Sequence, residues 1–129
     1  LINHSEKRQD PEKIRETVEK CDENNITTVV CAQTPKECEK YADFSPDYIA
    51  FEPPELIGGE VSVSKSEPEL IEKAVEKSGE VSTLTGAGIK TRKDVEKSIE
   101  LGCEGVLVAS GVIKSKDVGK EVIELCDGL

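Results

Sequence analysis

The sequence contains few of the residues that usually mark metal, redox or nucleic-acid sites. Its 129 residues include no Met, no Trp and a single His, and aromatic residues make up only 3%. A single histidine excludes a metal site built from several imidazoles. The formal net charge is -10 and no basic patch with interleaved aromatics is visible, so a phosphate-rich polymer is not expected as a partner. We therefore expect neither nucleic acid nor a bound metal.

Long apolar runs and paired cysteines are also absent. A membrane-spanning helix needs about 20 mainly apolar residues, and no run approaches that length, so we expect no membrane partner. The cysteines are odd in number and none are spaced as CxxC, which argues against a disulfide framework or a zinc site. We expect reduced thiols in a cytoplasmic protein. An initiator Met is missing too, and the chain opens within an apparent strand at Leu1, so we expect the natural start to lie upstream.

Short apolar segments alternate with amphipathic segments along the chain, which predicts strands joined by helices. The predicted strands are 1–3, 26–32, 47–51, 81–85 and 105–108. The predicted helices, most of which start after a capping residue or at a proline, are 11–23, a short one from 35, one from 68, 92–101 and about 116–126.

Strands that are apolar on both faces and joined by helices are typical of a parallel sheet in an α/β protein. The connections are short, so we expect a single domain over residues 1–129. An open doubly wound sheet and a closed barrel both fit this pattern. A complete eight-stranded barrel takes about 250 residues, and this chain is long enough for about five of its eight βα units.

The strand at 47–51 leads into the most informative stretch of the sequence. Its pairing must end at Glu52, because Pro53-Pro54 has no N–H to donate to a ladder. The hydrophobic pair Leu56-Ile57 and the flexible pair Gly58-Gly59 follow. A carboxylate at a strand end, ahead of a stiff and then flexible loop, is typical of a general base beneath a closing lid. The alternative interpretation is a chance acid at a strand end.

Unusual residues follow three other predicted strands: His4, the Gly-Ala-Gly-Ile segment 86–89, and the Ala-Ser-Gly segment 109–111. In a parallel α/β protein these positions share the face that holds the site. A neutral His4 could donate to a substrate oxygen, although lone histidines are often structural. Segment 86–89 lacks the third glycine of a dinucleotide fingerprint, since Thr91 stands there, so nicotinamide binding is not expected. Both loops are candidates for presenting backbone N–H groups to an anion, with ordinary strand-to-helix turns as the alternative.

Taken together, these motifs resemble one known family. Asn3-His4-Ser5-Glu6 matches the catalytic-histidine motif of triosephosphate isomerase, and segment 50–58, Ala-Phe-Glu-Pro-Pro-Glu-Leu-Ile-Gly, matches its catalytic-glutamate and lid motif. Segments 86–89 and 107–111 match its two phosphate-binding loops. The chain is thus similar to the C-terminal portion of the archaeal form, roughly the last five βα units. The resemblance implies a partial TIM (β/α)8 barrel with parallel strands.

The resemblance also implies a reaction and roles for individual residues. The reaction is the interconversion of dihydroxyacetone phosphate and glyceraldehyde 3-phosphate through an enediolate, without metal or cofactor, in glycolysis and gluconeogenesis. Glu52 would move the proton between carbons, neutral His4 would polarise the carbonyl, and Glu6 would orient the site from behind. The small phosphorylated triose would be held by Ile57, Gly58, Gly88, Ala109 and Ser110. Family analogy further implies a homo-oligomer, a dimer or a tetramer.

Two departures from the family pattern leave alternatives open. Gly59-Glu60 stands where many members have Thr-Gly, so the end of the lid would be looser. The family's essential Asn and Lys, and about three βα units before the histidine, have no counterpart in this chain. One alternative is therefore a non-enzymatic barrel fragment that needs a missing N-terminal half. The other is a different phosphate-binding barrel isomerase, from tryptophan or histidine biosynthesis, which the Glu-Pro-Pro and Asn-His-Ser-Glu motifs do not fit.

Overall fold

Four parallel strands form one sheet, in chain order, in the computed structural model, which describes residues 1–57, 59 and 61–129. The strands are β1 (Val29–Ala32), β2 (Tyr48–Phe51), β3 (Ser82–Thr85) and β4 (Gly105–Val106). The predicted strand at 1–3 contributes only one parallel bridge, between Ile2 and Val30. Two backbone hydrogen bonds, from Ile2 N to Val29 O (2.8 Å) and from Cys31 N to Ile2 O (2.9 Å), hold this segment beside β1.

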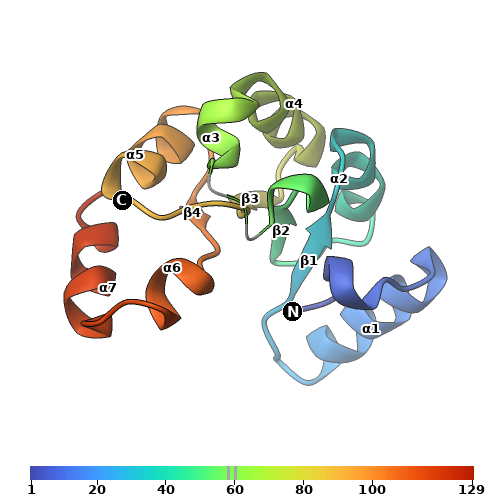
Figure 1. Cartoon of the computed structure of the whole chain (residues 1–129). Coiled ribbons are helices and arrows are strands. Elements are labelled where there is room, and N and C mark those ends of the chain that lie inside the picture. The colour runs from blue at the N-terminus through green and yellow to red at the C-terminus, as the bar shows by residue number, and fades with distance from the viewer. Residues whose placement is uncertain (58, 60) are drawn as a thin grey trace.

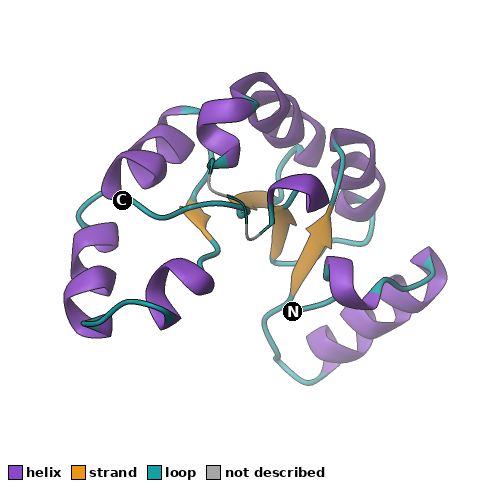
Figure 2. Cartoon of the chain, in the orientation of Figure 1, coloured by secondary structure: helices purple, strands orange, loops and turns teal. Residues whose placement is uncertain are grey.

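Helices follow the strands and form an arc around the sheet (Figures 1 and 2). The longer helices are α1 (Pro11–Glu23), α2 (Pro35–Ala42), α4 (Pro68–Ser78), α5 (Arg92–Glu100) and α7 (Val118–Cys126). Short helices are the 3-10 turns η1 (Ser5–Lys7) and η2 (Pro54–Leu56), and α3 (Val63–Ser66) and α6 (Ser110–Ile113). The five longer helices confirm the prediction, whereas the sequence patterns did not predict α3 and α6.

Signals at the helix starts explain why the chain folds in this way. Proline occupies the first position of α1, α2 and α4, where the missing N–H would have had no helical partner. Thr34 caps α2 by accepting a hydrogen bond from Glu37 N at 3.2 Å. Thr91 and Asp94 form a reciprocal capping box at the start of α5. Each cap fixes where a loop from the sheet ends and a helix begins.

Besides the segment at 1–3, two strands are at least two residues shorter than predicted. β1 begins at Val29 rather than 26, because Asn25 adopts a left-handed conformation (φ 55°) and Ile26 N bonds back to Cys21 O at 2.9 Å, which extends the turn after α1. The predicted strand 105–108 pairs with β3 only at its first two residues. Leu107 N still donates to Thr85 O at 2.8 Å, and the chain then turns into α6.

The core lies between the sheet and the surrounding helices. Its largest fully buried side chains come from β1, β2, α1, α3, α4 and α5: Phe51, Ile49, Val30, Ile14, Ile71, Val63 and Val95. Burial of each such side chain stabilises the fold by about 1.5–3 kcal/mol. The packed core therefore holds the strands, and with them the loops at their ends, in place. No helix within the described part of the chain is both long and apolar enough to cross a bilayer.

Candidate active site

A pocket opens where the C-terminal ends of the parallel strands meet, and most residues of the sequence motifs line it. Its volume is about 450 Å3. Of the predicted site residues it includes His4, Glu6, Glu52, Ile57, Gly88, Ala109 and Ser110. Gly58, the remaining predicted residue, lies outside the described part of the chain. Parallel topology therefore gathers segments that are far apart in sequence around one cavity.

The Glu52 carboxylate is buried in a slot between two neighbouring strand ends. Glu52 follows β2 directly, and its N–H donates to Ala32 O at 2.9 Å. Its Oε2 accepts a hydrogen bond from the Cys31 thiol at 3.3 Å. On the other side stands Gly86, where an added Cβ would lie 2.8 Å from Glu52 Cγ. Gly86 is therefore needed for space, and Cys31 supplies a polar contact.

Cys31 is a donor to the carboxylate and not a nucleophile. Burial raises the pKa of the Cys31 thiol far above its ordinary value, and the neighbouring Glu52 carboxylate raises it further. The thiol therefore keeps its proton at neutral pH. From the sequence, Cys31 was expected only to be one of several reduced thiols, and this contact was not predicted. The signal available was its place near the end of the strand next to Glu52, which only the sheet register makes useful.

His4 presents a hydrogen-bond donor to the same pocket. Its Nδ1 accepts a hydrogen bond from Glu6 N at 3.4 Å. A neutral imidazole has one donor and one acceptor nitrogen, so this contact assigns the proton to Nε2. His4 Nε2 lies 3.9 Å from Glu52 Oε2, which is too long for a hydrogen bond and leaves both atoms available to a ligand.

Glu6 contacts His4 chiefly through its backbone. The Glu6 carboxylate is 90% exposed and lies 3.9 Å from His4 Nδ1. The carboxylate is therefore mostly in solvent, and the N–H of Glu6 makes the hydrogen bond that orients the imidazole.

Asn3 anchors the His4 loop, a role that was not predicted from the sequence. It is buried and adopts a left-handed conformation (φ 65°), which Asn tolerates better than most residues. Its side-chain NH2 donates to Cys31 O at 3.0 Å and to the Tyr41 hydroxyl at 3.2 Å. Its Oδ1 accepts from Gln9 N at 2.9 Å. These bonds tie the loop that carries His4 to β1 and α2.

The two small-residue loops approach each other closely beside the pocket. Gly88 of the first loop has φ 73°, as does the preceding Ala87, so two consecutive residues are left-handed. A Cβ added at Gly111 of the second loop would lie 3.0 Å from Ile89 O. Gly88, Ala109 and Ser110 all line the pocket on this side. Ser110 and Gly111 were expected in a loop, but they form the first turn of α6.

The lid segment leaves the pocket and returns to the first glycine loop. The N-terminal part of this segment is η2, which directly precedes Ile57, a residue of the pocket lining. In its C-terminal part, Val63 N donates to Ala87 O at 3.1 Å. A Cβ added at Gly88 would lie 2.9 Å from Ser62 Cα, so the two backbones are in close contact. The looser hinge predicted for Gly59-Glu60 falls partly outside the described residues, because Glu60 is not among them.

The charges around the pocket are mainly negative. It is lined by the carboxylates of Glu6 and Glu52, and none of its described lining residues is Lys or Arg. Within the described residues, no group of three or more His, Cys, Asp or Glu side chains could hold a metal ion. The arrangement offers an acceptor for a carbon-bound proton, a donor for an oxygen and small-residue loops for an anion.

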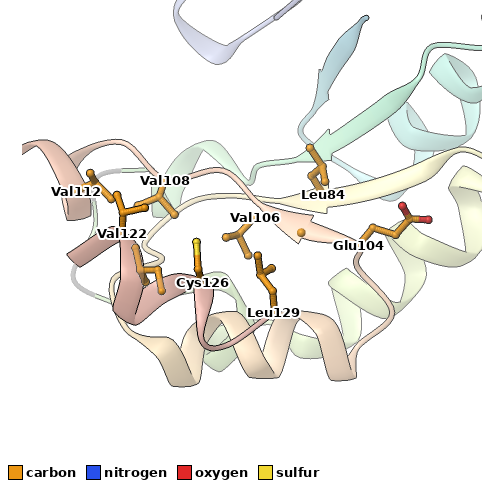
Figure 3. A pocket seen from close by; sticks show the side chains of 10 residues that line it. Leu84, Glu104, Val106, Val108, Val112, Val122, Cys126 and Leu129 are labelled. Carbon is orange, nitrogen blue, oxygen red and sulfur yellow. The ribbon is translucent and has the colours of Figure 1, made fainter. Parts of the chain in front are cut away.

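A second pocket, of about 360 Å3, lies beside β4 and differs in character (Figure 3). Val106 of β4 faces Val122 and Cys126 of α7 across it, and aliphatic side chains make up most of its lining. Glu104 lies at one side. This pocket pairs no acid with a base, so we assign the candidate active site to the pocket that holds Glu52 and His4.

Comparison with known protein families gives one match over nearly the whole chain. The model of the triosephosphate isomerase family matches residues 1–127. The triosephosphate isomerase of Methanothermus fervidus is 46% identical over 129 residues, which is 97% of this chain and 58% of that protein. The enzyme of Thermoplasma volcanium is 47% identical over 119 residues, covering 91% of this chain and 56% of that protein.

Solved structures show the fold. An archaeal fructose 1,6-bisphosphate aldolase superposes with a TM-score of 0.71 at 17% identity, covering 92% of this chain and 50% of that one. Thiamine phosphate pyrophosphorylase from Pyrococcus furiosus gives a TM-score of 0.71 at 18% identity, covering 99% and 56%. The parallel sheet with its surrounding helices is accordingly part of a (β/α)8 barrel, as the resemblance implied.

The chain spans 56–58% of the length of these two curated relatives. The family match covers the His4 loop, the Glu52 strand end and both small-residue loops in a single alignment. This chain belongs to the triosephosphate isomerase family and forms part of that family's barrel.

Proposed function

We propose that this chain supplies the acid–base half of a triose-phosphate isomerase site, which interconverts dihydroxyacetone phosphate and glyceraldehyde 3-phosphate. The observation that carries the proposal is the meeting of Glu52 Oε2 and His4 Nε2, 3.9 Å apart, in one pocket of a chain from this family. The two groups have complementary roles, because one accepts a proton and the other donates a hydrogen bond.

Glu52 removes the proton from the carbon next to the carbonyl. As the C–H bond breaks, its electron pair forms the carbon–carbon double bond of the enediolate, and the carbonyl oxygen gains negative charge. His4 gives its Nε2 proton to that oxygen and then takes the proton of the neighbouring hydroxyl, so that the negative charge moves to the second oxygen and His4 is again neutral. Glu52 returns its proton to the other carbon, which completes the isomerisation. The slot between Cys31 and Gly86 supports this role, since it limits where the carboxylate can point.

The phosphate of the substrate binds opposite these two groups. We assign it to the backbone around Gly88, Ala109 and Ser110, with Ile57 and Gly58 contributing from the lid. The small residues of both loops and the left-handed Gly88 support this assignment, because glycine in such a conformation lets a ligand approach the backbone closely. Closure of the lid excludes water and so protects the enediolate from losing phosphate.

The described lining of the pocket contains no Lys or Arg, and the whole chain has a net charge of -10. An anionic substrate therefore needs a cation from elsewhere. We propose that a further segment, corresponding to the part of the relatives that this chain does not span, supplies it and closes the barrel. The same observation favours the alternative function, a non-enzymatic fragment that has no activity by itself.

A coupled dehydrogenase assay tests the proposal. The 129-residue chain is assayed alone and after co-expression with the N-terminal part of the Methanothermus fervidus relative. We expect turnover from the combination, and about a 10³-fold loss for Glu52→Gln, the range that a general base contributes. Glu72→Gln, an exposed acid on α4, is the matched control and keeps full activity. A folded combination without turnover would contradict the proposal, whereas robust turnover by the chain alone would exclude the fragment alternative.

We further propose that the chain works in the cytoplasm as a homo-oligomer, a dimer or tetramer, and that residues 1–129 belong to one domain. All five cysteines are free thiols, which supports a reducing compartment. Exposed aliphatic side chains on α6 and α7, among them Ile113 and Ile123, support association with another subunit.

A further inference from the structure

Asp94 is a buried carboxylate that the proposed reaction does not use. It occupies the third position of α5, and its side chain is 2% exposed. Its Oδ2 accepts three hydrogen bonds from the segment just before the helix: Lys90 N at 3.2 Å, Thr91 N at 2.9 Å and Thr91 Oγ1 at 2.8 Å. These bonds are the usual contribution of an acidic residue to a capping box. They connect Asp94 to the end of the first glycine loop.

The second oxygen of Asp94 bonds to a different part of the chain. Oδ1 accepts from Ser62 Oγ at 2.7 Å and from Lys65 Nζ at 2.7 Å. The Asp94 backbone carbonyl also accepts from Ser64 Oγ at 3.2 Å. Ser62 to Lys65 are the residues at which the lid returns to the barrel and α3 begins. A capping box alone would leave this oxygen unused.

Burial opposes the charged form of Asp94, but the hydrogen bonds from Lys65, Ser62 and Thr91 outweigh it, so the pKa of the carboxyl lies well below its ordinary value. The carboxylate is therefore charged at neutral pH, and each bond that it accepts is charge-assisted. Lys65 is the partner that faces solvent, with 55% of its side chain exposed.

We propose that Asp94 is a positioning residue that fixes the returning end of the lid, residues 61–65, to the glycine loop at 86–91. One oxygen holds each segment, so the two segments move as one body. The bond from Val63 N to Ala87 O and the close approach of Gly88 to Ser62 lie along the same seam. The link between the two segments stands on these contacts alone. Its consequence for the lid rests on the proposed function: Ile57 and Gly88 would approach the same substrate phosphate in a fixed relative position.

Hydrogen–deuterium exchange on the full chain tests the link without any activity. In Ser62→Ala and Lys65→Met, we expect amides 61–67 to exchange about tenfold faster, because charge-assisted bonds to a buried carboxylate are lost. Amides of α5 keep their wild-type rates, since Oδ2 still caps the helix. Lys65→Arg restores slow exchange. Thr91→Ala has the opposite effect: amides in the first turn of α5 exchange faster, and amides 61–67 keep their wild-type rates.

Lys97→Met is the matched control, because Lys97 pairs with exposed Glu100 on the same helix and does not contact the lid. It changes neither segment. Wild-type exchange at 61–67 in both the Ser62 and Lys65 variants would overturn the proposal. So would an equal loosening of 61–67 and all of α5, because Asp94 would then act only as a helix cap.

A kinetic measurement separates this proposal from the proposed function. The complemented enzyme is this chain co-expressed with the N-terminal part of the Methanothermus fervidus relative. In it, Lys65→Met lowers kcat roughly fivefold with little change in KM. The reason is that a lid held out of register weakens contacts made in the transition state. If exchange changes but the wild type has no isomerase activity, the proposed function fails and the link stands. If the wild type is active and neither exchange nor kcat responds to Lys65→Met, the link fails and the function stands.

Discussion

At the scale of single residues, the position of the Glu52 carboxylate depends on what its neighbours lack as much as on what they carry. Gly86 has no side chain where a Cβ would meet Glu52 Cγ at 2.8 Å. Cys31 contributes a protonated thiol at 3.3 Å. Both neighbours border the carboxylate, which also lines the pocket that contains His4 Nε2.

The first prediction concerns Gly86→Ala. The added methyl group displaces the Glu52 carboxylate, and a shift of about 1 Å in a catalytic group can lower activity about 10²-fold. We expect a loss of that size in kcat/KM of the complemented enzyme. Gly119→Ala on α7 is the control, because its Cβ would meet no atom closer than 3.7 Å. A Gly86→Ala variant with wild-type kcat/KM would show that the slot does not set the position of Glu52.

The second prediction concerns thiol reactivity. Burial raises the pKa of the Cys38 thiol and of the Cys103 thiol to about 12, and raises that of Cys31 further, so their thiolate fractions at pH 8 are very small. Alkylation with iodoacetamide, followed by mass spectrometry, should label exposed Cys126 first and leave these three unlabelled in the folded chain. All five should react in urea. Labelling of Cys38 or Cys103 as fast as Cys126 would contradict the burial described here.

At the scale of elements, the lid has one rigid end and one bonded end. The rigid end is the Pro53-Pro54 step, which leads from Glu52 into η2. The bonded end is Ser62 to Lys65, held on Asp94. Glu52, the proposed base, lies directly before the Pro53-Pro54 end.

The third prediction concerns Asp94 and pH. Asp94→Asn weakens bonds to Ser62 and Lys65, and we expect a loss of about 2 kcal/mol in the free energy of unfolding near pH 7. Because the folded pKa is below the unfolded value, the stabilisation is present above about pH 4 and is lost as pH falls through the folded pKa. Urea unfolding at several pH values should show the gap between wild type and variant closing in acid. Glu100→Gln, on the exposed side of α5, should show no such gap at any pH.

Much of the fold at this scale was predictable from the sequence, and the failures have physical reasons. Proline and threonine caps located the starts of α1, α2, α4 and α5, because caps are local signals. Pairing length depends on neighbouring strands, so the segments at 1–3 and 105–108 form fewer ladder bonds than their apolar runs predicted. The short helix α3 depends on contacts of Ser62 and Ser64 with Asp94, which no local pattern reveals.

The candidate site divides in the same way. Glu52 and His4 were predictable because each follows a strand and belongs to a specific motif. The partners that position them were not. Asn3, Cys31 and Gly86 act across strands through hydrogen bonds or close approach, and these relations require the register of the sheet. Likewise, the resemblance predicted that the Glu6 side chain orients the site, whereas it is the backbone N–H of Glu6 that makes the hydrogen bond to His4.

At the scale of the whole molecule, the arc of elements has two distinct ends (Figure 1). One end carries the bridge at Ile2 beside β1, and the other carries β4 with α6 and α7. Aliphatic side chains are exposed at the second end, including Ile113 (72%), Ile123 (66%) and Leu129 (67%). Exposed apolar groups that gather on one region favour association with another polypeptide.

The fourth prediction concerns this association. Ile123→Lys places a charge on the exposed apolar face of α7, and we expect the dissociation constant for self-association to rise roughly tenfold. Sedimentation velocity over a concentration series measures it. Ile26→Lys is the matched control, since Ile26 is comparably exposed (57%) but lies at the turn after α1. Equal association of the Ile123 variant and the wild type would assign the interface to another face.

The central claim is that Glu52 transfers a proton between two carbons of a triose phosphate, and solvent deuterium tests it most directly. NMR in D2O follows deuterium entering the carbon-bound positions of dihydroxyacetone phosphate with the complemented enzyme. A carboxylate that exchanges its proton with solvent while holding the enediolate predicts incorporation by the wild type and its loss, by about 10³-fold, in Glu52→Gln. Incorporation by Glu52→Gln at the wild-type rate would contradict the account, because another group would then be the base.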